Sequence, residues 1–237
     1  MSVALITGAS RGFGFALAHA LAERGWHLLI DARGSEALER AAREVGSDQV
    51  TAIAGDVADP EHRRRLREAV LELGSLDLLV NNASTLGAAP LPGLERYPID
   101  ELERVYRINA IAPLALIQEL LPFLTEASGT IVNITSDAAV EAYEGWGGYG
   151  SAKAALDQLS AVLGAEQQSI CVYAFDPGDM RTAMQQAAFP GEDISDRPEP
   201  EVMVPALLRL LDEAPPSGRY RATDLLVPGS AVGAGAL

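Results

Sequence analysis

The chain is poor in cysteine, in basic residues and in long apolar runs. Cys171 is the single cysteine among 237 residues, which excludes an internal disulfide framework and suits a reducing compartment. Acidic residues outnumber basic ones 33 to 18, and the formal net charge of -15 argues against nucleic acid or an anionic membrane as a partner. No metal site is expected.

Signals that would divide or target the chain are also missing. The N-terminal residues show no signal-peptide pattern, and no apolar run reaches the length of a membrane span. We find no repeat, linker or low-complexity tract. Because 48% of the residues are hydrophobic, the chain can bury a sizeable core. We therefore expect one domain over residues 1–237 and a soluble, cytoplasmic protein.

Short apolar segments alternate with helical patterns along the chain. Strands are expected at 3–7, 26–30, 50–57, 76–80, 129–136 and 169–175. Helical patterns are expected at 15–24, 37–45, 60–73, 99–108, 113–124 and 149–163. This alternation predicts an α/β fold, a doubly wound parallel sheet of Rossmann-like type with helices on both faces.

A glycine-rich turn follows the first expected strand. It reads Gly8-Ala-Ser-Arg-Gly12-Phe-Gly14 and leads directly into a helix. Glycines let the backbone approach a pyrophosphate, and the helix N-terminus supplies free N–H groups. The turn therefore predicts dinucleotide binding. At the end of the second expected strand, Asp31 favours the ribose hydroxyls of NAD and Arg33 the 2′-phosphate of NADP, so the residues leave both cofactors open.

A tyrosine and a lysine, Tyr149 and Lys153, lie four residues apart on an expected helix and so share one face. A neighbouring ammonium favours the phenolate and lowers the pKa of the phenol, as a positive nicotinamide would. The pair is therefore a candidate proton donor and its activator.

Four motifs in order and spacing resemble those of the short-chain dehydrogenase/reductase family. They are Thr7-Gly-x-x-x-Gly12-x-Gly14, Asn81-Asn-Ala, Ser136 with Tyr149-x-x-x-Lys153, and Pro177-Gly178 with Thr182. The resemblance implies a catalytic tetrad of Asn109, Ser136, Tyr149 and Lys153. In it, Ser136 binds the substrate oxygen, Tyr149 donates the proton, and Asn109 anchors a water that links Lys153 to bulk solvent.

The same resemblance implies the cofactor contacts. They are Gly8, Arg11, Gly12, Phe13, Gly14, Arg33, Asp56, Val57, Asn82, Ala83, Tyr149, Lys153, Pro177, Gly178 and Thr182. Family alignment places Ala32 where NAD-preferring members carry an acid and Arg33 where NADP-preferring members carry a base. We therefore expect NADP(H), with NAD(H) possible. One departure is Ser84, where the family motif ends in glycine.

Three local stretches resemble the sepiapterin reductase and carbonyl (diketone) reductase subgroup: 144–146, 182–186 and 207–218. The resemblance implies a pocket walled by Leu86, Tyr143, Trp146, Met184 and Phe189, and residues 183–200 look like a substrate lid. The subgroup's pterin-anchoring carboxylate aligns with Ala222, and Asp224 lies two residues further along an expected strand. With Arg219 and Arg221 making the local field positive, we do not expect a pterin substrate.

Two classes of function remain at this stage. The first is an NADPH-dependent oxidoreductase that interconverts a small carbonyl compound and its alcohol, and the second is a non-catalytic dinucleotide-binding sensor or scaffold. The intact tetrad favours the enzyme, because a pure binder needs no Ser136 and Tyr149 together. The resemblance also implies a homodimer or homotetramer, paired through the helices near Pro113 and Tyr149. Part of that apolar face would come from Ala115, Leu116, Leu120, Leu156 and Leu159.

Overall fold

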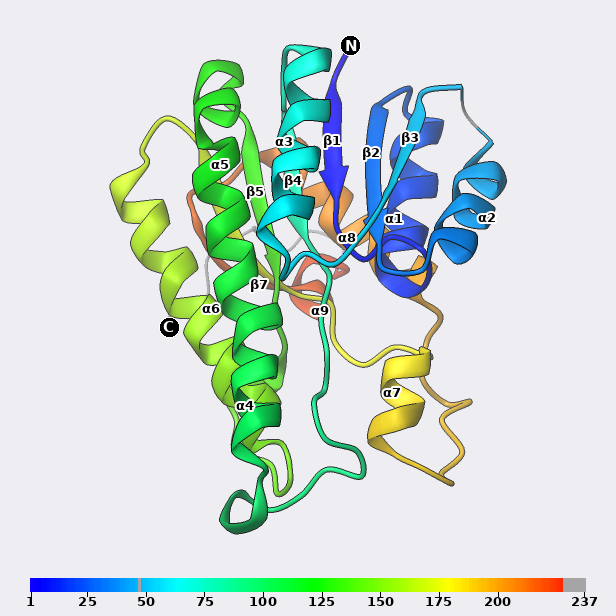
Figure 1. Ribbon diagram of the computed structural model, residues 1–237, viewed down its shortest axis with the longest axis vertical. Helices are drawn as coiled ribbons and strands as arrows, with labels where there is room; N and C mark the ends of the chain where they lie inside the picture. Colours follow the sequence, from blue (N-terminus) through cyan, green and yellow to red (C-terminus); the bar gives the residue numbers. More distant parts are fainter. Residues whose placement is uncertain (47, 228–237) are drawn as a thin grey trace.

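The computed structural model describes residues 1–46 and 48–227. Within them, seven strands form one parallel sheet in the order β3-β2-β1-β4-β5-β6-β7 (Figure 1). The strands are β1 (Val3–Ile6), β2 (His27–Ala32), β3 (Val50–Ala54), β4 (Leu78–Asn81), β5 (Thr130–Ile134), β6 (Cys171–Asp176) and β7 (Gly218–Arg221). The strand order reverses between β1 and β4, the place where open α/β sheets bind their ligands. The expected doubly wound fold is thus confirmed.

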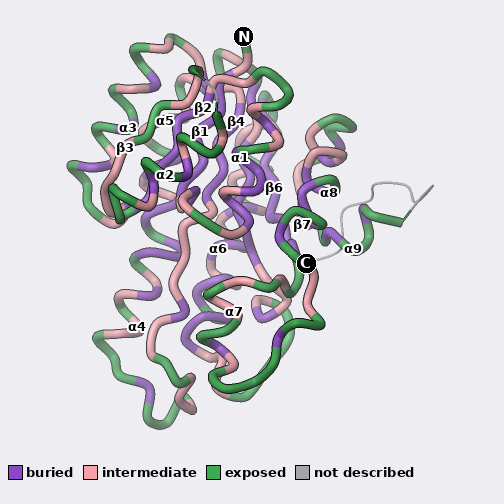
Figure 2. Tube along the Cα trace, turned by 90° about the vertical axis from the view of Figure 1, so that its right-hand side faces the viewer, coloured by how far each residue is buried: buried purple, intermediate pink, exposed green. Residues whose placement is uncertain are grey.

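Helices connect the strands and cover both faces of the sheet. They are α1 (Gly12–Glu23), α2 (Ser35–Val45), α3 (Pro60–Leu73), α4 (Ile99–Tyr106), α5 (Ala112–Ala127), α6 (Gly147–Glu166), α7 (Ala183–Ala188), α8 (Pro200–Glu213) and α9 (Ala222–Leu225). Two short 3-10 turns lie at Leu94–Arg96 and Asp137–Ala139, and a π-helical turn at Arg107–Ile111 joins α4 to α5. Figure 2 shows the buried segments concentrated in the sheet and on the helix faces turned toward it.

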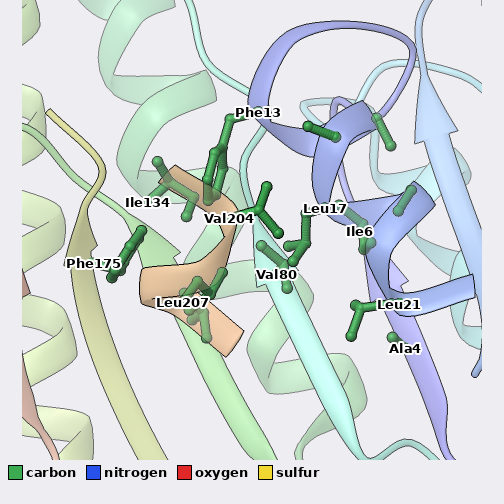
Figure 3. Close-up of a cluster of buried hydrophobic side chains, with 14 of the residues drawn as sticks. Ala4, Ile6, Phe13, Leu17, Leu21, Val80, Ile134, Phe175, Val204 and Leu207 are labelled. Atoms are coloured by element: carbon green, nitrogen blue, oxygen red, sulfur yellow. The ribbon is translucent and has the colours of Figure 1, made fainter. Parts of the chain in front are cut away.

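One face of the sheet packs against α1 and α8. Leu17 and Leu21 of α1 meet Ile6 and Val80 of the central strands (Figure 3). Leu207 of α8 belongs to the same buried cluster, and α8 packs directly on α1. This layer fixes the start of α1, and with it the glycine-rich turn, against the carboxyl ends of the strands.

The other face packs against α3 and α5. Leu66, Leu116 and Leu124 are buried there with the strand residues Leu5 and Leu79. The continuous helix Ile99–Ala127 is long and apolar enough to cross a membrane. It was not identified from the sequence, in which no apolar run of that length was found. In this fold its apolar face is core packing against the sheet.

The carboxyl-terminal part differs most from the sequence expectation. The strand β7 and the helix α8 were not predicted, and α9 occupies the position expected to be a strand. The second strand was predicted to end at Ile30 but continues through Ala32, so that Asp31 is a strand residue that pairs with β3.

Candidate functional site

A cavity of about 980 Å³ opens at the carboxyl ends of the strands and runs from Arg33 to Phe189. Most residues singled out in the sequence line it. These are Gly8, Arg11, Gly12, Phe13, Arg33, Asp56, Val57, Leu86, Asn82, Ala83, Ser136, Tyr143, Trp146, Tyr149, Lys153, Pro177, Gly178, Thr182, Met184 and Phe189. Gly14 and Asn109 do not line the cavity.

The glycine-rich turn forms one end of this cavity. Gly8 has a φ of +68°, and a Cβ there would lie 2.8 Å from the Cα of Ala83, so the position requires glycine. The Asn82 side chain donates to the carbonyl oxygens of Thr7 and Gly8 at 2.9 and 3.1 Å and holds the two loops together. Gly14 makes room for this same side chain, since a Cβ there would lie 2.4 Å from Asn82 Nδ2.

The first turn of α1 presents its N–H groups without a competitor. No side chain among the described residues caps this helix, and its first turn holds no acidic residue. Unpaired N–H groups at a helix N-terminus, beside a close-approaching glycine backbone, suit a phosphate group.

The two charged residues near the end of β2 have different environments. Asp31 is 1% exposed, and its carboxylate accepts from the Gly8 N–H and lies 2.6 Å from Nε2 of His62. Arg33 is exposed at the cavity rim. The structure thus leaves Arg33, rather than Asp31, available to a group bound at this end.

Lys153 lies one turn after Tyr149 in α6, and both side chains are buried. Its Nζ lies 5.6 Å from the Tyr149 ring centroid and donates to the Ile134 carbonyl oxygen at 2.7 Å. Burial lowers the pKa of Lys153 to about 8, while the charges of Asp157 and Asp176 act in the opposite direction.

Some neighbours of the Tyr149 phenol raise its pKa and others lower it. Burial raises its pKa, the charge of Asp176 raises it further, and the hydrogen bonds with Ser84 and Ser136 lower it. The protein's own groups thus raise the pKa of this phenol, opposite to the effect expected of the tyrosine–lysine spacing alone.

Ser136 lies beside the phenol, just after β5, but its proton is already held. Its hydroxyl donates to Oδ1 of Asp137 at 2.9 Å and accepts from the Ala138 N–H. The other Asp137 oxygen accepts from the Tyr143 hydroxyl at 3.1 Å. A substrate oxygen that takes a hydrogen bond from Ser136 must therefore compete with Asp137.

Asn109 lies in the π-helical turn and is fully buried. Its Oδ1 accepts from the Ser84 hydroxyl at 3.2 Å and from the Thr85 N–H at 2.9 Å, while its Nδ2 donates to the Thr85 carbonyl oxygen at 2.8 Å. Asn109 therefore holds the loop after β4, and through Ser84 it reaches Tyr149. Its expected role in a water relay stays a prediction.

The far end of the cavity is apolar and aromatic. Leu86 and Tyr149 pack with Trp146, Met184 and Phe189 in one cluster. Trp146 stands edge-on to Tyr149, with ring centroids 5.7 Å apart, and its ring lies 6.0 Å from Phe189. The five residues expected to wall the pocket thus come together at the cavity, with Tyr143 at its exposed edge.

Sequence reasoning missed a buried ionic cluster behind the site. Arg219 of β7 donates to Asp157 of α6 at 3.0 Å, to Asp176 of β6 at 2.9 Å and to the Ser136 carbonyl oxygen at 3.0 Å. Two features of the sequence place a carboxylate close to the expected site. Asp157 follows Lys153 by one helical turn, and Asp176 directly precedes Pro177-Gly178. The expectation that Arg219 makes the local field positive is wrong, because the carboxylates of Asp157 and Asp176 compensate its charge.

The region aligned with the pterin anchor also differs from expectation. Ala222 is fully buried and Asp224 is exposed, paired with Arg221 at 3.3 Å, on the short helix α9 instead of a strand. Asp224 is therefore not displaced from Ala222 by two residues along a strand, as the sequence predicted, but follows it on a helical turn. Neither residue lines the cavity within the described chain, and the absence of pterin chemistry stays a prediction.

Comparison with known proteins agrees with this geometry. A family model described as short chain dehydrogenase matches residues 2–193. Sepiapterin reductase of Meriones unguiculatus is 38% identical over 202 residues, covering 79% of this chain and 77% of that protein. Benzil reductase ((S)-benzoin forming) of Bacillus subtilis is 34% identical over 196 residues, covering 78% and 77%.

Among solved structures, a short-chain dehydrogenase from Escherichia coli complexed with NADPH superposes with a TM-score of 0.87. It is 28% identical, and the match covers 93% of this chain and 96% of that one. The fold, the glycine-rich turn at the switch point, and the family match over most of the chain lead to one conclusion. The protein belongs to the short-chain dehydrogenase/reductase family of oxidoreductases.

Proposed function

We propose that this protein is an NADPH-dependent carbonyl reductase, which reduces a ketone or aldehyde of a small organic substrate to the alcohol or catalyses the reverse. The observation that carries the proposal is the placement of Ser136, Tyr149 and Lys153 in the same cavity as the uncapped glycine-rich turn. A dinucleotide held at the turn and a carbonyl held at the hydroxyls would share one continuous space.

The residues present fit a dinucleotide phosphate. Gly8 and Gly12 line the cavity beside the free N-terminus of α1, and the exposed Arg33 stands at its rim. A guanidinium suits a 2′-phosphate because it can donate two parallel hydrogen bonds to it. A solved relative holds NADPH, which supports the same choice. When bound, the cofactor supplies a hydride to the carbonyl carbon.

The proton for the carbonyl oxygen would come from Tyr149. Burial raises the pKa of this phenol, so that it carries its proton at neutral pH, as reduction requires. The charge of Lys153 favours the phenolate that remains after transfer. Ser136 would turn its hydroxyl from Asp137 to the substrate oxygen and stabilise the negative charge that develops there.

The substrate end favours an aromatic or otherwise apolar carbonyl compound, because Leu86, Trp146 and Phe189 form its wall. The relatives that reduce sepiapterin and benzil support this class. The segment from α7 to Pro200 borders the cavity through Met184, Phe189 and Glu199. We propose that it acts as the substrate lid.

The loss of reduced-nicotinamide absorbance with a panel of aldehydes, ketones and aromatic diketones tests the proposal. We expect NADPH consumption that depends on both enzyme and carbonyl compound, with aromatic diketones among the better substrates. Tight NADPH binding without turnover of any member of the panel would instead support the non-catalytic binder.

A further inference from the structure

The acid in β2 is held by a chain of three side chains. Asp31 Oδ2 lies 2.6 Å from His62 Nε2, and His62 Nδ1 lies 3.1 Å from Nη2 of Arg65. A guanidinium can only donate hydrogen bonds, so Nδ1 accepts and Nε2 carries the hydrogen given to Asp31. The order of donation is therefore Arg65 to His62 to Asp31.

The histidine of this chain is built into the fold. His62 is 0% exposed in α3, and a Cβ at Gly55 would lie 2.1 Å from its Nδ1, so the ring occupies its place only because residue 55 is glycine. Arg65 is exposed, and its guanidinium also donates to the Ala54 carbonyl oxygen at 3.3 Å.

The other oxygen of Asp31 is used as well, since Oδ1 accepts from the Gly8 N–H at 3.0 Å. Asp31, Arg33 and Asp56 line the same end of the cavity. Burial raises the pKa of Asp31, and the hydrogen bonds from His62 and Gly8 act to lower it. The carboxylate thus stands next to the adenosine end of the proposed cofactor site but has its two oxygens engaged by the protein.

We propose that His62 is a specificity-determining residue for the cofactor: held by Arg65, it occupies the Asp31 oxygen that the glycine-rich turn leaves free, and so lets the site accept a 2′-phosphate. Without His62, Asp31 would regain an oxygen free to accept from a ribose hydroxyl, which favours NADH. Its charge would also lose the hydrogen bond from His62 and would repel the 2′-phosphate of NADPH. This inference rests on the proposed NADPH dependence.

Direct binding of NADPH and of NADH to the purified protein, measured by calorimetry or nucleotide fluorescence, tests the inference without a carbonyl substrate. In His62→Leu the ratio of the NADH Kd to the NADPH Kd should fall about tenfold or more, equivalent to ~1.4 kcal/mol. His62→Gln keeps a donor for Asp31 and an acceptor for Arg65, so its ratio should stay near that of the wild type.

Two further variants separate selectivity from loss of packing. Asp31→Asn/His62→Leu removes the carboxylate charge and should restore the preference for NADPH, because the effect of His62 acts through Asp31. His19→Leu changes an exposed histidine of α1 and should leave the ratio unchanged. Equal weakening of both nucleotides in His62→Leu, or the same shift in the double variant, would overturn the inference. A wild type that binds NADH as tightly as NADPH would instead contradict the proposed cofactor.

Discussion

At the scale of single residues, Ser84 is the departure from the family motif with the clearest chemical consequence. Its hydroxyl donates to Asn109 at 3.2 Å and also lowers the pKa of Tyr149. Asn109 Oδ1 can only accept a hydrogen bond, so the Ser84 hydroxyl donates its proton to Asn109 while Tyr149 is neutral. In that state the Tyr149 hydroxyl donates to the Ser84 oxygen. Once Tyr149 has lost its proton, Ser84 can rotate and donate to the phenolate.

Ser84→Ala should therefore raise the pKa of Tyr149. Alcohol oxidation needs the phenolate, so the rise of kcat/KM with pH should move to higher pH, while reduction should persist to higher pH than in the wild type. The measurement is the pH profile in both directions. Ser151→Ala, which removes an exposed hydroxyl of α6 bonded to the Gly148 carbonyl oxygen, should leave both profiles in place. Unchanged profiles in Ser84→Ala would show that its hydroxyl has no part in the ionisation.

Arg33→Ala should raise the KM for NADPH far more than that for NADH. A charge-assisted contact with the 2′-phosphate is worth about 1.5–3 kcal/mol, or about ten- to a hundredfold. Steady-state kinetics with each cofactor measures the ratio. Arg40→Ala, an exposed arginine of α2 that does not line the cavity, is the matched control. Equal effects of Arg33→Ala on both cofactors would assign the 2′-phosphate to another residue.

At the scale of elements, local pattern predicted the first six strands and the helices α1 to α6 that lie between them in the sequence. The glycine-rich turn was predictable because glycine spacing, apolar strand and helix adjoin in the sequence. The strand β7 was not, because Gly218–Arg221 carries two arginines in four residues and no apolar run, and the arginines were interpreted as a positive local field. Arg219 is buried only through partners 62 and 43 residues away, and no local pattern reveals such contacts. In α8, the internal Pro205 interrupts the helical pattern.

The buried cluster of β7 gives a stability prediction at this scale. Arg219→Met leaves Asp157 and Asp176 buried without their cation, which should cost about 3–5 kcal/mol in the free energy of unfolding. Chemical denaturation measures it. Arg221→Met, two residues along the same strand, removes an exposed pair and should cost no more than about 1 kcal/mol. Similar values for both variants would show that the cluster contributes little.

At the scale of the whole molecule, pairing of two copies stays a prediction. Three of the five residues expected on the pairing face, Leu116, Leu120 and Leu156, are instead buried within the chain's own core. Sequence periodicity could not distinguish core packing from contact with a second copy, because a helix that is buried on one side and paired on the other is apolar on both sides. Of the apolar side chains on α6, Val162 is 43% exposed.

We expect a dimer or tetramer by light scattering at micromolar concentration. Val162→Glu should shift it toward the monomer, since a charge would enter an apolar contact, while leaving the far-ultraviolet circular dichroism unchanged. Leu71→Glu, on the exposed side of α3, is the control. A wild-type monomer would remove this prediction.

The central claim is that Tyr149 delivers the proton to a carbonyl bound beside the dinucleotide site. Single-turnover consumption of NADPH by wild type and Tyr149→Phe, with the best carbonyl substrate of the panel, tests it most directly. We expect the rate to fall about 10²- to 10⁴-fold, the usual contribution of a general acid, while the NADPH Kd stays within a few fold of the wild type. A variant that retains more than about a tenth of the rate would contradict the claim and point to another acid.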